Sequence, residues 1–365
     1  MSVRTAGRQG GKATDRKAIA DLPSCRPAAL QLPLPLPTHP AAGLPVLDVR
    51  ERGTAFFGLP IRSVLNSPAS TGMGFWSLNP YVGCEFGCSY CYARDTHRWA
   101  VERTAGRQDG KTAESDDSSL PSCRSAVLPS DLPPLDAFEH RILVKTEVVD
   151  ALRRTLDPAR VGDTAIVIGT ATDPYQPAER KFLLTRRILE ALLGWRGLTV
   201  SLTTKSALVT RDIDLLQRLA GRHDLSVNIS LATADPVLLR RLEPRTPLPH
   251  ARLRAVRALA DAGVPVYVLL APVLPGLTDG WASLAAVMEA ARTASARDVV
   301  GSPLRLGPAA KARFLPLLRR EFPDLAPRYE RHYGGRANAS RAYSRALARR
   351  VRLLREAYGF RRSDD

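Results

Sequence analysis

The chain has 365 residues, 44% of them hydrophobic, and its 53 Lys and Arg against 36 Asp and Glu give a formal net charge of +17. This hydrophobic content excludes a wholly disordered chain, and five cysteines in 365 residues exclude a disulfide-stapled scaffold. No apolar run reaches the roughly 18–20 residues of a membrane span, because the best candidate, Val264–Leu277, is too short and contains three prolines.

Two segments of the chain are predicted to be disordered. Residues 1–45 contain no Phe, Trp or Tyr and seven prolines, and residues 101–137 have the same polar, aromatic-free character. The two segments also share the stretches RTAGRQ and LPSCR, which indicates a duplicated low-complexity insertion. Because Cys25 and Cys123 each lie in one of these copies, we do not expect either of them to be a ligand or a catalyst.

Strand-like and helix-like runs alternate through the rest of the chain. A helix is predicted from Pro177 to Gly194 and another from Pro249 to Gly263, each beginning at a proline, which favours the first helical position. Such alternation predicts an α/β fold with a parallel sheet, in which functional residues gather at the carboxyl ends of the strands. The predicted strands are Phe75–Leu78, Ile142–Val144, Ala165–Ile168, Leu198–Leu202, Leu225–Leu231 and Val266–Leu270.

The positive charge concentrates at the C-terminal end. Residues 301–365 hold 16 Lys and Arg against 6 Asp and Glu, a net of 16 − 6 = +10. Basic helices are predicted over Ala310–Arg320 and Ser340–Ala357. They are interpreted either as a face that binds nucleic acid or as a helical cap with its arginines in solvent. We therefore divide the chain into a Pro-rich tail (1–45), a main domain (46–300, with the insertion 101–137) and a basic helical region (301–365).

Three cysteines form the strongest chemical signal. Cys84, Cys88 and Cys91 are spaced C-x3-C-x2-C directly after the first predicted strand, and three thiolates on one tight loop can converge on a metal or a cluster. One interpretation is a cubane iron–sulfur cluster with one iron left open, because such clusters usually take four cysteines. A second interpretation is structural zinc with His97 as the fourth ligand, and a third is that these are ordinary small residues.

The spacing, with Tyr90 before the last cysteine, resembles the signature of the radical S-adenosylmethionine (SAM) superfamily. Further stretches are similar to the spore photoproduct lyase-like branch of that superfamily, whose members are largely uncharacterised bacterial proteins. They lie in order from Asn79 to Asp279 and read NPYVGCEFGCSYCYAR, GTATDPYQPAE, TTKSALVTRDIDLL, LEPRTP and APVLPGLTD.

The resemblance implies a partial (β/α)6 TIM-like barrel that binds a [4Fe–4S] cluster through the three cysteines. SAM would chelate the fourth iron, and an external electron donor would drive its reductive cleavage to a 5′-deoxyadenosyl radical that abstracts hydrogen from a substrate. The resemblance also implies a set of SAM-binding residues: Tyr90, Thr172, Lys205, Ser230 and Ala271. Asp173 and Tyr175 are the candidates for catalysis, and Gln176 is a further candidate for lining the substrate cavity.

The resemblance leaves the substrate open. Spore photoproduct lyase has a cysteine hydrogen donor where Thr170 stands here, and a threonine O–H bond is far too strong to replace a thiol. The substrate is interpreted as nucleic acid on the basis of charge, and the alternative is a non-catalytic nucleic-acid-binding protein with structural zinc. Glu243 and Arg245 are expected to form a structural ion pair. We expect a cytoplasmic protein, because an iron–sulfur enzyme of this kind needs a reducing compartment.

Overall fold

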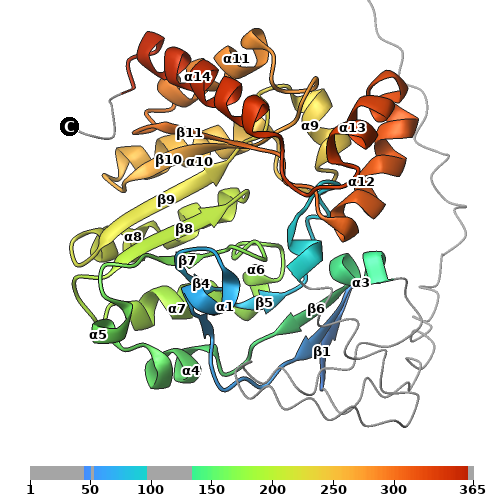
Figure 1. The fold of residues 1–365 in the computed structure, drawn as a ribbon. Coiled ribbons are helices and arrows are strands. Elements are labelled where there is room, and N and C mark those ends of the chain that lie inside the picture. Colours follow the sequence, from blue (N-terminus) through green and yellow to red (C-terminus); the bar gives the residue numbers. More distant parts are fainter. Residues whose placement is uncertain (1–44, 51–52, 97–133, 361–365) are drawn as a thin grey trace, which may run out of the picture. The chain divides into compact units, whose positions relative to one another are not determined.

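The computed structural model describes residues 45–50, 53–96 and 134–360, which belong to the compact unit Pro40–Asp365. Its main feature is a seven-stranded sheet in the order β11-β10-β9-β8-β7-β4-β3, in which all neighbours pair in parallel except β3 and β4 (Figure 1). The strands are β3 (Leu65–Asn66), β4 (Trp76–Leu78), β7 (Ile166–Ile168), β8 (Thr199–Thr204), β9 (Asp224–Ser230), β10 (Val266–Val273) and β11 (Val299–Pro303). The six parallel strands of this open sheet agree with the predicted α/β partial barrel.

A second, four-stranded sheet has the order β1-β2-β6-β5, formed by β1 (Val46–Val49), β2 (Ala55–Gly58), β5 (Tyr81–Val82) and β6 (Arg141–Val144). The predicted strand Ile142–Val144 lies in this small sheet and not in the barrel. The sixth parallel strand is instead β11, which the sequence analysis missed because VVGSP is short and contains glycine and proline. β11 ends at Pro303, three residues beyond the domain boundary expected at residue 300.

Helices connect the parallel strands and flank the sheet (Figure 1). Successive residues of β8, β9 and β10 alternate between buried and half-buried, and the buried face includes Val227, Val266 and Val268, which are 0% exposed. The connecting helices are α1 (Pro68–Thr71), α3 (Pro134–His140), α4 (Val148–Thr155), α5 (Pro158–Val161), α6 (Glu179–Phe182), α7 (Leu184–Leu192), η1 (Ala207–Asp212), α8 (Ile213–Ala220), α9 (Pro236–Leu242), α10 (Pro249–Asp261) and α11 (Trp281–Thr293).

The helix predicted from Pro177 to Gly194 is broken into α6 and α7. Leu183 between them has φ +55°, a left-handed conformation that no α-helix interior contains. The buried carboxylate of Glu179 accepts hydrogen bonds from the N–H groups of Thr185 (3.0 Å) and Arg186 (3.2 Å), so it caps the first turn of α7. The prediction of one continuous helix was wrong. The spacing of apolar residues is the same for one helix as for two short helices in succession, and the break depends on the cap that the Glu179 side chain provides.

The C-terminal helices take two different positions. They are α12 (Pro308–Glu321), η2 (Pro323–Leu325), α13 (Ala326–Tyr333) and α14 (Arg341–Ala357). α12 and α13 pack beside the cysteine segment through an aromatic chain in which Phe314 contacts both Tyr90 and Tyr329 edge to face. α14 instead packs on β11, where Gly301 leaves room for Val351: a Cβ on this glycine would lie 2.8 Å from a Val351 methyl carbon.

The two predicted disordered segments fall almost wholly outside the described residues, together with Cys25, Cys123 and His97. The described part of the second segment, Pro134–Ala137, is the start of α3 and not disordered, because Ala137 and Phe138 are buried against the rest of the fold. Within the described residues, no helix combines the length and the apolar composition needed to cross a bilayer.

Candidate active site

The cysteine segment is tied down by elements that are distant in the sequence. The N–H of Cys84 donates to the carbonyl of Phe138 in α3 (2.9 Å), and both the N–H (3.0 Å) and the hydroxyl (2.9 Å) of Ser89 donate to the carbonyl of Leu242 in α9. The buried amide of Gln176 accepts from the N–H of Glu85 (2.9 Å) and donates to the carbonyl of Gly83 (3.2 Å). Gln176 therefore clamps this segment to the loop after β7, whereas the sequence analysis considered it only for cavity lining.

The three thiols are enclosed, since Cys84 and Cys88 are buried and Cys91 is partly buried. Burial raises the pKa of Cys84 to about 12, and burial also raises the pKa of Cys88 and Cys91. Binding a metal here would therefore release protons from these thiols. Gly87 allows the segment to turn with φ +60°, and a Cβ there would meet the guanidinium of Arg245 at 2.1 Å.

Tyr90 is hydrogen-bonded to a fully buried ion pair. Its hydroxyl donates to the carboxylate of Glu243, which forms a salt bridge with Arg252 in which both side chains are 0% exposed. Arg252 also donates to the carbonyl of Ser230 at the end of β9 (2.7 Å), and Thr246 donates to Glu243 (2.8 Å). Burial opposes the charge of Glu243, but the charge of Arg252 holds the pKa of this carboxyl below its usual value.

The expected Glu243–Arg245 ion pair was wrong. Arg245 pairs instead with Glu139 of α3, which also binds Arg94, because residues two apart on this turn face different ways.

The sequence contained a signal for Arg252, the residue with which Glu243 does pair. Arg252 stands at the start of the buried stripe Arg252, Ala255, Val256 and Leu259 of α10, where an apolar residue would be the ordinary choice.

Asp173 joins the loop after β7 to the end of β8. Its carboxylate accepts from the hydroxyl of Thr204 (2.6 Å) and from the N–H groups of Lys205 (2.7 Å) and Tyr175 (2.9 Å). Burial raises the pKa of Asp173, although these hydrogen bonds act against the rise. The N–H of Asp173 also donates to Cys84, which places this turn directly beside the cysteines.

Lys205 and Thr172 present polar groups beside the cysteines. Burial opposes the charge of Lys205, but the neighbouring Cys88 and Glu243 hold its pKa above the usual value. Within the described residues, the structure gives the Lys205 ammonium no hydrogen bond or ion pair. The Thr172 hydroxyl makes one long contact, 3.5 Å to the carbonyl of Tyr81, so both groups retain capacity for a ligand.

The remaining predicted SAM contacts lie on the next two strands. Ser230 at the end of β9 donates its hydroxyl to the carbonyl of Ala271 in β10 (2.9 Å), so these two residues are in contact. Through Arg252 and Glu243, Ser230 is connected to Tyr90 and thus to the cysteine segment. The structure therefore brings Tyr90, Thr172, Lys205 and Ser230 to one end of the sheet.

Thr170 and Tyr92 complete this end of the sheet. The Thr170 hydroxyl is buried and bonded to Ser77 (2.5 Å) and Asn79 (2.9 Å), so it belongs to the framework. Tyr92, which the sequence analysis missed although it directly follows Cys91, is 38% exposed, and its hydroxyl donates to the carbonyl of Thr170.

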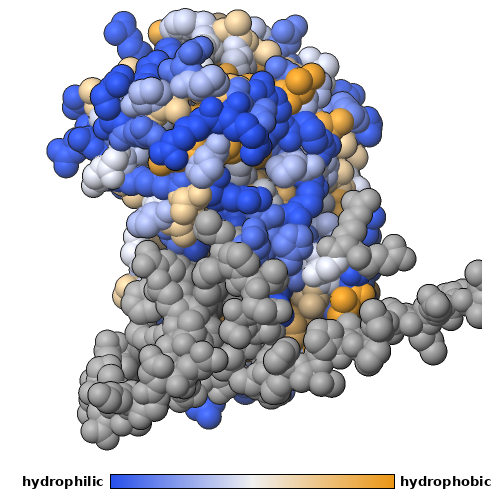
Figure 2. Space-filling model, turned by 90° about the vertical axis from the view of Figure 1, so that its right-hand side faces the viewer, coloured by the Kyte–Doolittle hydropathy of each residue, from blue (hydrophilic) through white to orange (hydrophobic). Residues whose placement is uncertain are grey.

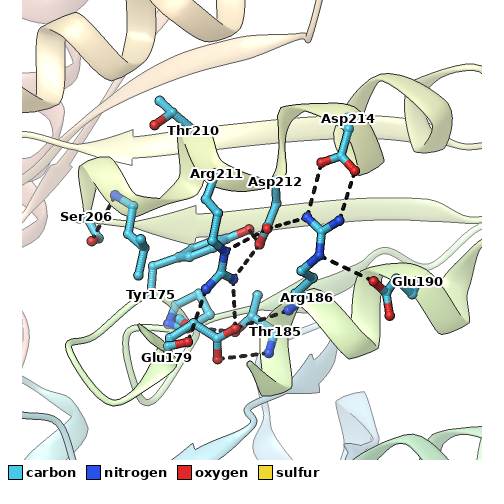
Figure 3. A network of polar contacts seen from close by, with 12 residues as sticks. Tyr175, Glu179, Thr185, Arg186, Glu190, Ser206, Thr210, Arg211, Asp212 and Asp214 are labelled. Carbon is cyan, nitrogen blue, oxygen red and sulfur yellow. Dashed lines mark hydrogen bonds and ion pairs between the residues drawn. The ribbon is translucent and has the colours of Figure 1, made fainter. Parts of the chain in front are cut away.

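Tyr175 points into a polar network between α6, α7 and η1 (Figure 3). Its ring is 1% exposed, and its hydroxyl donates to Asp212 at 3.0 Å. The same carboxylate also pairs with Arg186 (2.8 Å) and Arg211 (2.7 Å). The hydroxyl of Tyr175 is therefore engaged in joining helices. Tyr92 also has a bonded hydroxyl, but it differs from Tyr175 in being 38% exposed.

The donor set at this end fits an iron–sulfur cluster. Three cysteine thiols are soft ligands of the kind such clusters use, and Cys91 raises the pKa of both Cys84 and Cys88, which indicates that the three are neighbours. Among the described residues, no three His, Cys, Asp or Glu side chains meet closely enough to hold a single ion. In an iron–sulfur cluster each cysteine binds a different iron, so three cysteines of one segment can serve as ligands of one cluster.

Comparison with known proteins gives consistent matches. The sequence model of the Radical SAM superfamily matches residues 78–287. An uncharacterised protein of Mycobacterium tuberculosis (strain ATCC 25618 / H37Rv) is 32% identical over 84% of this chain and 82% of its own length. One of Methanocaldococcus jannaschii is 27% identical over 55% of this chain and 61% of its own length.

Solved structures show the same fold. A mutant of spore photoproduct lyase with bound AdoMet and dinucleoside spore photoproduct superposes with a TM-score of 0.55 at 15% identity, over 83% of this chain and 79% of its own. Spore photoproduct lyase complexed with dinucleoside spore photoproduct gives a TM-score of 0.54 at 15% identity, over 82% of this chain and 79% of its own.

Proposed function

Because this chain belongs to the radical SAM superfamily, and is thus an enzyme that uses SAM and an iron–sulfur cluster, we propose that Cys84, Cys88 and Cys91 hold a [4Fe–4S] cluster for the reductive cleavage of SAM. The observation that carries the proposal is the enclosed trio of thiols at the carboxyl ends of parallel strands, next to Lys205, whose ammonium makes no hydrogen bond or ion pair within the described residues. When bound, the cluster supplies the electron that cleaves SAM to methionine and a 5′-deoxyadenosyl radical.

The residues around the thiols have distinct proposed roles. Lys205 binds the methionine carboxylate of SAM, since its ammonium is held in the charged form and forms no ion pair or hydrogen bond among the described residues. Thr172 adds a hydroxyl, Ser230 and the backbone of Ala271 line the next two strands, and Tyr90 offers its carbonyl. Because the hydroxyl of Tyr90 is anchored on Glu243, its carbonyl is held in a fixed orientation.

Two residues are assigned differently from the others. Asp173 acts as a positioning residue, because its carboxylate is occupied by Thr204 and by backbone N–H groups. Tyr92 is the phenol that we propose contacts the substrate, because it is exposed beside Cys91 and Tyr175 is not. With Thr170 bonded into the framework, any hydrogen returned to a product would come from a group other than this hydroxyl.

For the substrate we propose nucleic acid. The support is the net charge of +17 and its concentration in residues 301–365, whose described part includes the helices α12, α13 and α14. An external one-electron donor completes the set of partners. The zinc alternative would need His97 as a fourth ligand, and His97 lies outside the described residues.

The test is cluster content and SAM cleavage of anaerobically reconstituted protein. We expect about four irons per chain, an altered cluster EPR spectrum on addition of SAM, and 5′-deoxyadenosine after reduction with dithionite. Cys91→Ala should lose all three signals, whereas Cys25→Ala should keep them. A colourless protein with one zinc, or nucleoside formation by Cys91→Ala, would overturn the proposal.

A further inference from the structure

Four arginines form a stripe along the outer face of α14. Arg341, Arg345, Arg349 and Arg352 are all exposed, and their spacing of four, four and three residues places them on one side of the helix. We call these four residues the arginine stripe. At 1.5 Å per residue, it extends over about 16 Å.

The stripe arginines form no ion pair within the described residues, although Glu356 follows Arg352 by four residues on the same helix. The two arginines on the flank of α14 are bonded into the fold, Arg350 to the carbonyl of Asp279 and Arg355 to the carboxylate of Asp298. The four stripe arginines have no such partner, and the one carboxylate of the helix, Glu356, stands near its far end. Like charges three or four residues apart destabilise a helix, so folding alone does not favour this pattern.

The stripe begins at the end of the sheet that carries the cysteines. Tyr343 donates to the carboxylate of Asp279 (3.1 Å), in the loop that follows β10. Trp281, two residues further at the start of α11, is 52% exposed, although tryptophan is highly buried on average. Arg305, just after β11, is also exposed. Positive charge and an exposed aromatic ring therefore lie near one another at this edge.

The surroundings favour a hydrated partner over a lipid surface. Three of the large apolar residues of α14, Leu347, Val351 and Leu354, are buried in the fold. Leu353 is the one large apolar residue of this helix that is exposed (42%), so the helix offers little apolar surface to insert into a membrane. Figure 2 shows that the described upper part of the face carrying α12 and α13 is mostly hydrophilic, with apolar residues scattered in it.

From these observations we propose that the arginine stripe binds the phosphate backbone of single-stranded nucleic acid, and that Trp281 stacks on one of its bases. The proposal rests on the proposed function for its substrate class and adds the surface that holds the strand. Arginine pairs well with phosphate, and aromatic stacking together with a basic track is how proteins bind single strands without reading sequence.

The salt dependence of binding gives a quantitative test. Each phosphate neutralised on a single strand contributes about −0.7 to the slope of log K against log salt, so four contacts give about −2.8. Raising the salt from about 50 to 200 mM should then weaken binding roughly 50-fold. Removing two of the four contacts should bring the slope to about −1.4.

The experiment measures fluorescence anisotropy of labelled oligothymidylate, and of an RNA of mixed sequence, with reconstituted full-length protein. Arg345→Gln/Arg349→Gln should bind at least tenfold more weakly at about 50 mM salt, with the shallower slope. The matched control, Arg153→Gln/Arg154→Gln, removes the same charge from two exposed arginines of α4 and should match wild type. Trp281→Ala should weaken binding at least fivefold at every salt concentration.

Each other outcome has a defined meaning. If Arg345→Gln/Arg349→Gln and Arg153→Gln/Arg154→Gln bind equally well, and circular dichroism shows that both are folded, the proposal that the arginine stripe binds nucleic acid is refuted. Equal or tighter binding of a duplex overturns the single-strand assignment, and binding only to anionic vesicles overturns nucleic acid as the partner. The cluster-free Cys91→Ala protein should show the same stripe-dependent binding, so a failure of SAM cleavage and a failure of this surface are distinguishable.

Discussion

Replacing Arg252 by methionine should destabilise the protein strongly at neutral pH. The substitution keeps most of the volume but leaves the carboxylate of Glu243, 0% exposed, without its cation. Breaking a buried pair in this way costs about 3–5 kcal/mol. Because Tyr90 and Thr246 still donate to the carboxylate, we expect the lower end, about 3 kcal/mol.

The effect should depend on pH with a definite sign. In the wild type the pKa of Glu243 is lowered in the folded state, so the stabilisation is present above about 4.5, the ordinary value, and is lost as the pH falls below it. In the variant, burial without Arg252 raises the pKa of Glu243 in the folded state. The penalty is therefore absent at low pH and grows as the pH rises through about 4.5.

The assay is urea unfolding of the apoprotein from about pH 4 to pH 7, followed by circular dichroism. Arg254→Met, an exposed arginine of the same helix, should change stability by less than about 0.5 kcal/mol. Adding Glu243→Gln to Arg252→Met removes the stranded charge and should recover most of the loss. A loss that is independent of pH, and that the second substitution does not recover, would refute the assignment to an unpaired buried carboxylate.

Three further substitutions test the site. Lys205→Met should weaken SAM binding about 10- to 100-fold, the value of one charged hydrogen bond, without loss of iron, as measured by equilibrium dialysis; unchanged affinity would remove Lys205 from the SAM site. Gly87→Ala should lower iron retention, because its Cβ would lie 2.1 Å from Arg245, whereas Gly72→Ala has a similar φ of +65° and open space and should retain iron. Tyr175→Phe should cost about 0.5–1.5 kcal/mol of stability and leave 5′-deoxyadenosine formation intact; a folded variant that no longer forms the nucleoside would make the Tyr175 hydroxyl catalytic.

The architecture was predictable from the sequence where the signal is local. The buried strands β7 to β10 appear as apolar runs between helix-like stretches, and α10 and α14 begin and end within two residues of the predicted bounds. The cysteine motif is also local, because its three cysteines lie within eight positions. The α6–α7 break and β11 escaped prediction because a side-chain cap and a short Gly- and Pro-containing strand leave little periodic signal.

The contacts around the thiols were not predictable, because they depend on which way a side chain turns in three dimensions. Glu243 and Arg245 are close in sequence, yet their partners are Arg252 and Glu139, on α10 and α3. Tyr175 and Tyr92 illustrate the same limit. Both are tyrosines beside motif residues, but one is buried against helices and the other is exposed. The sequence identifies the charged and aromatic residues near the motif, whereas tertiary packing decides which way each side chain points and what it contacts.

The tethering of the cysteine segment has a consequence for biogenesis. Ser89 is held by the carbonyl of Leu242, 153 residues later in the chain, and Cys84 by the carbonyl of Phe138. A nascent chain that ends before α9 contains all three cysteines but lacks the contact that fixes the second half of their loop. The loop of the three cysteines can therefore be held in its native position only after the chain has been synthesised through α9.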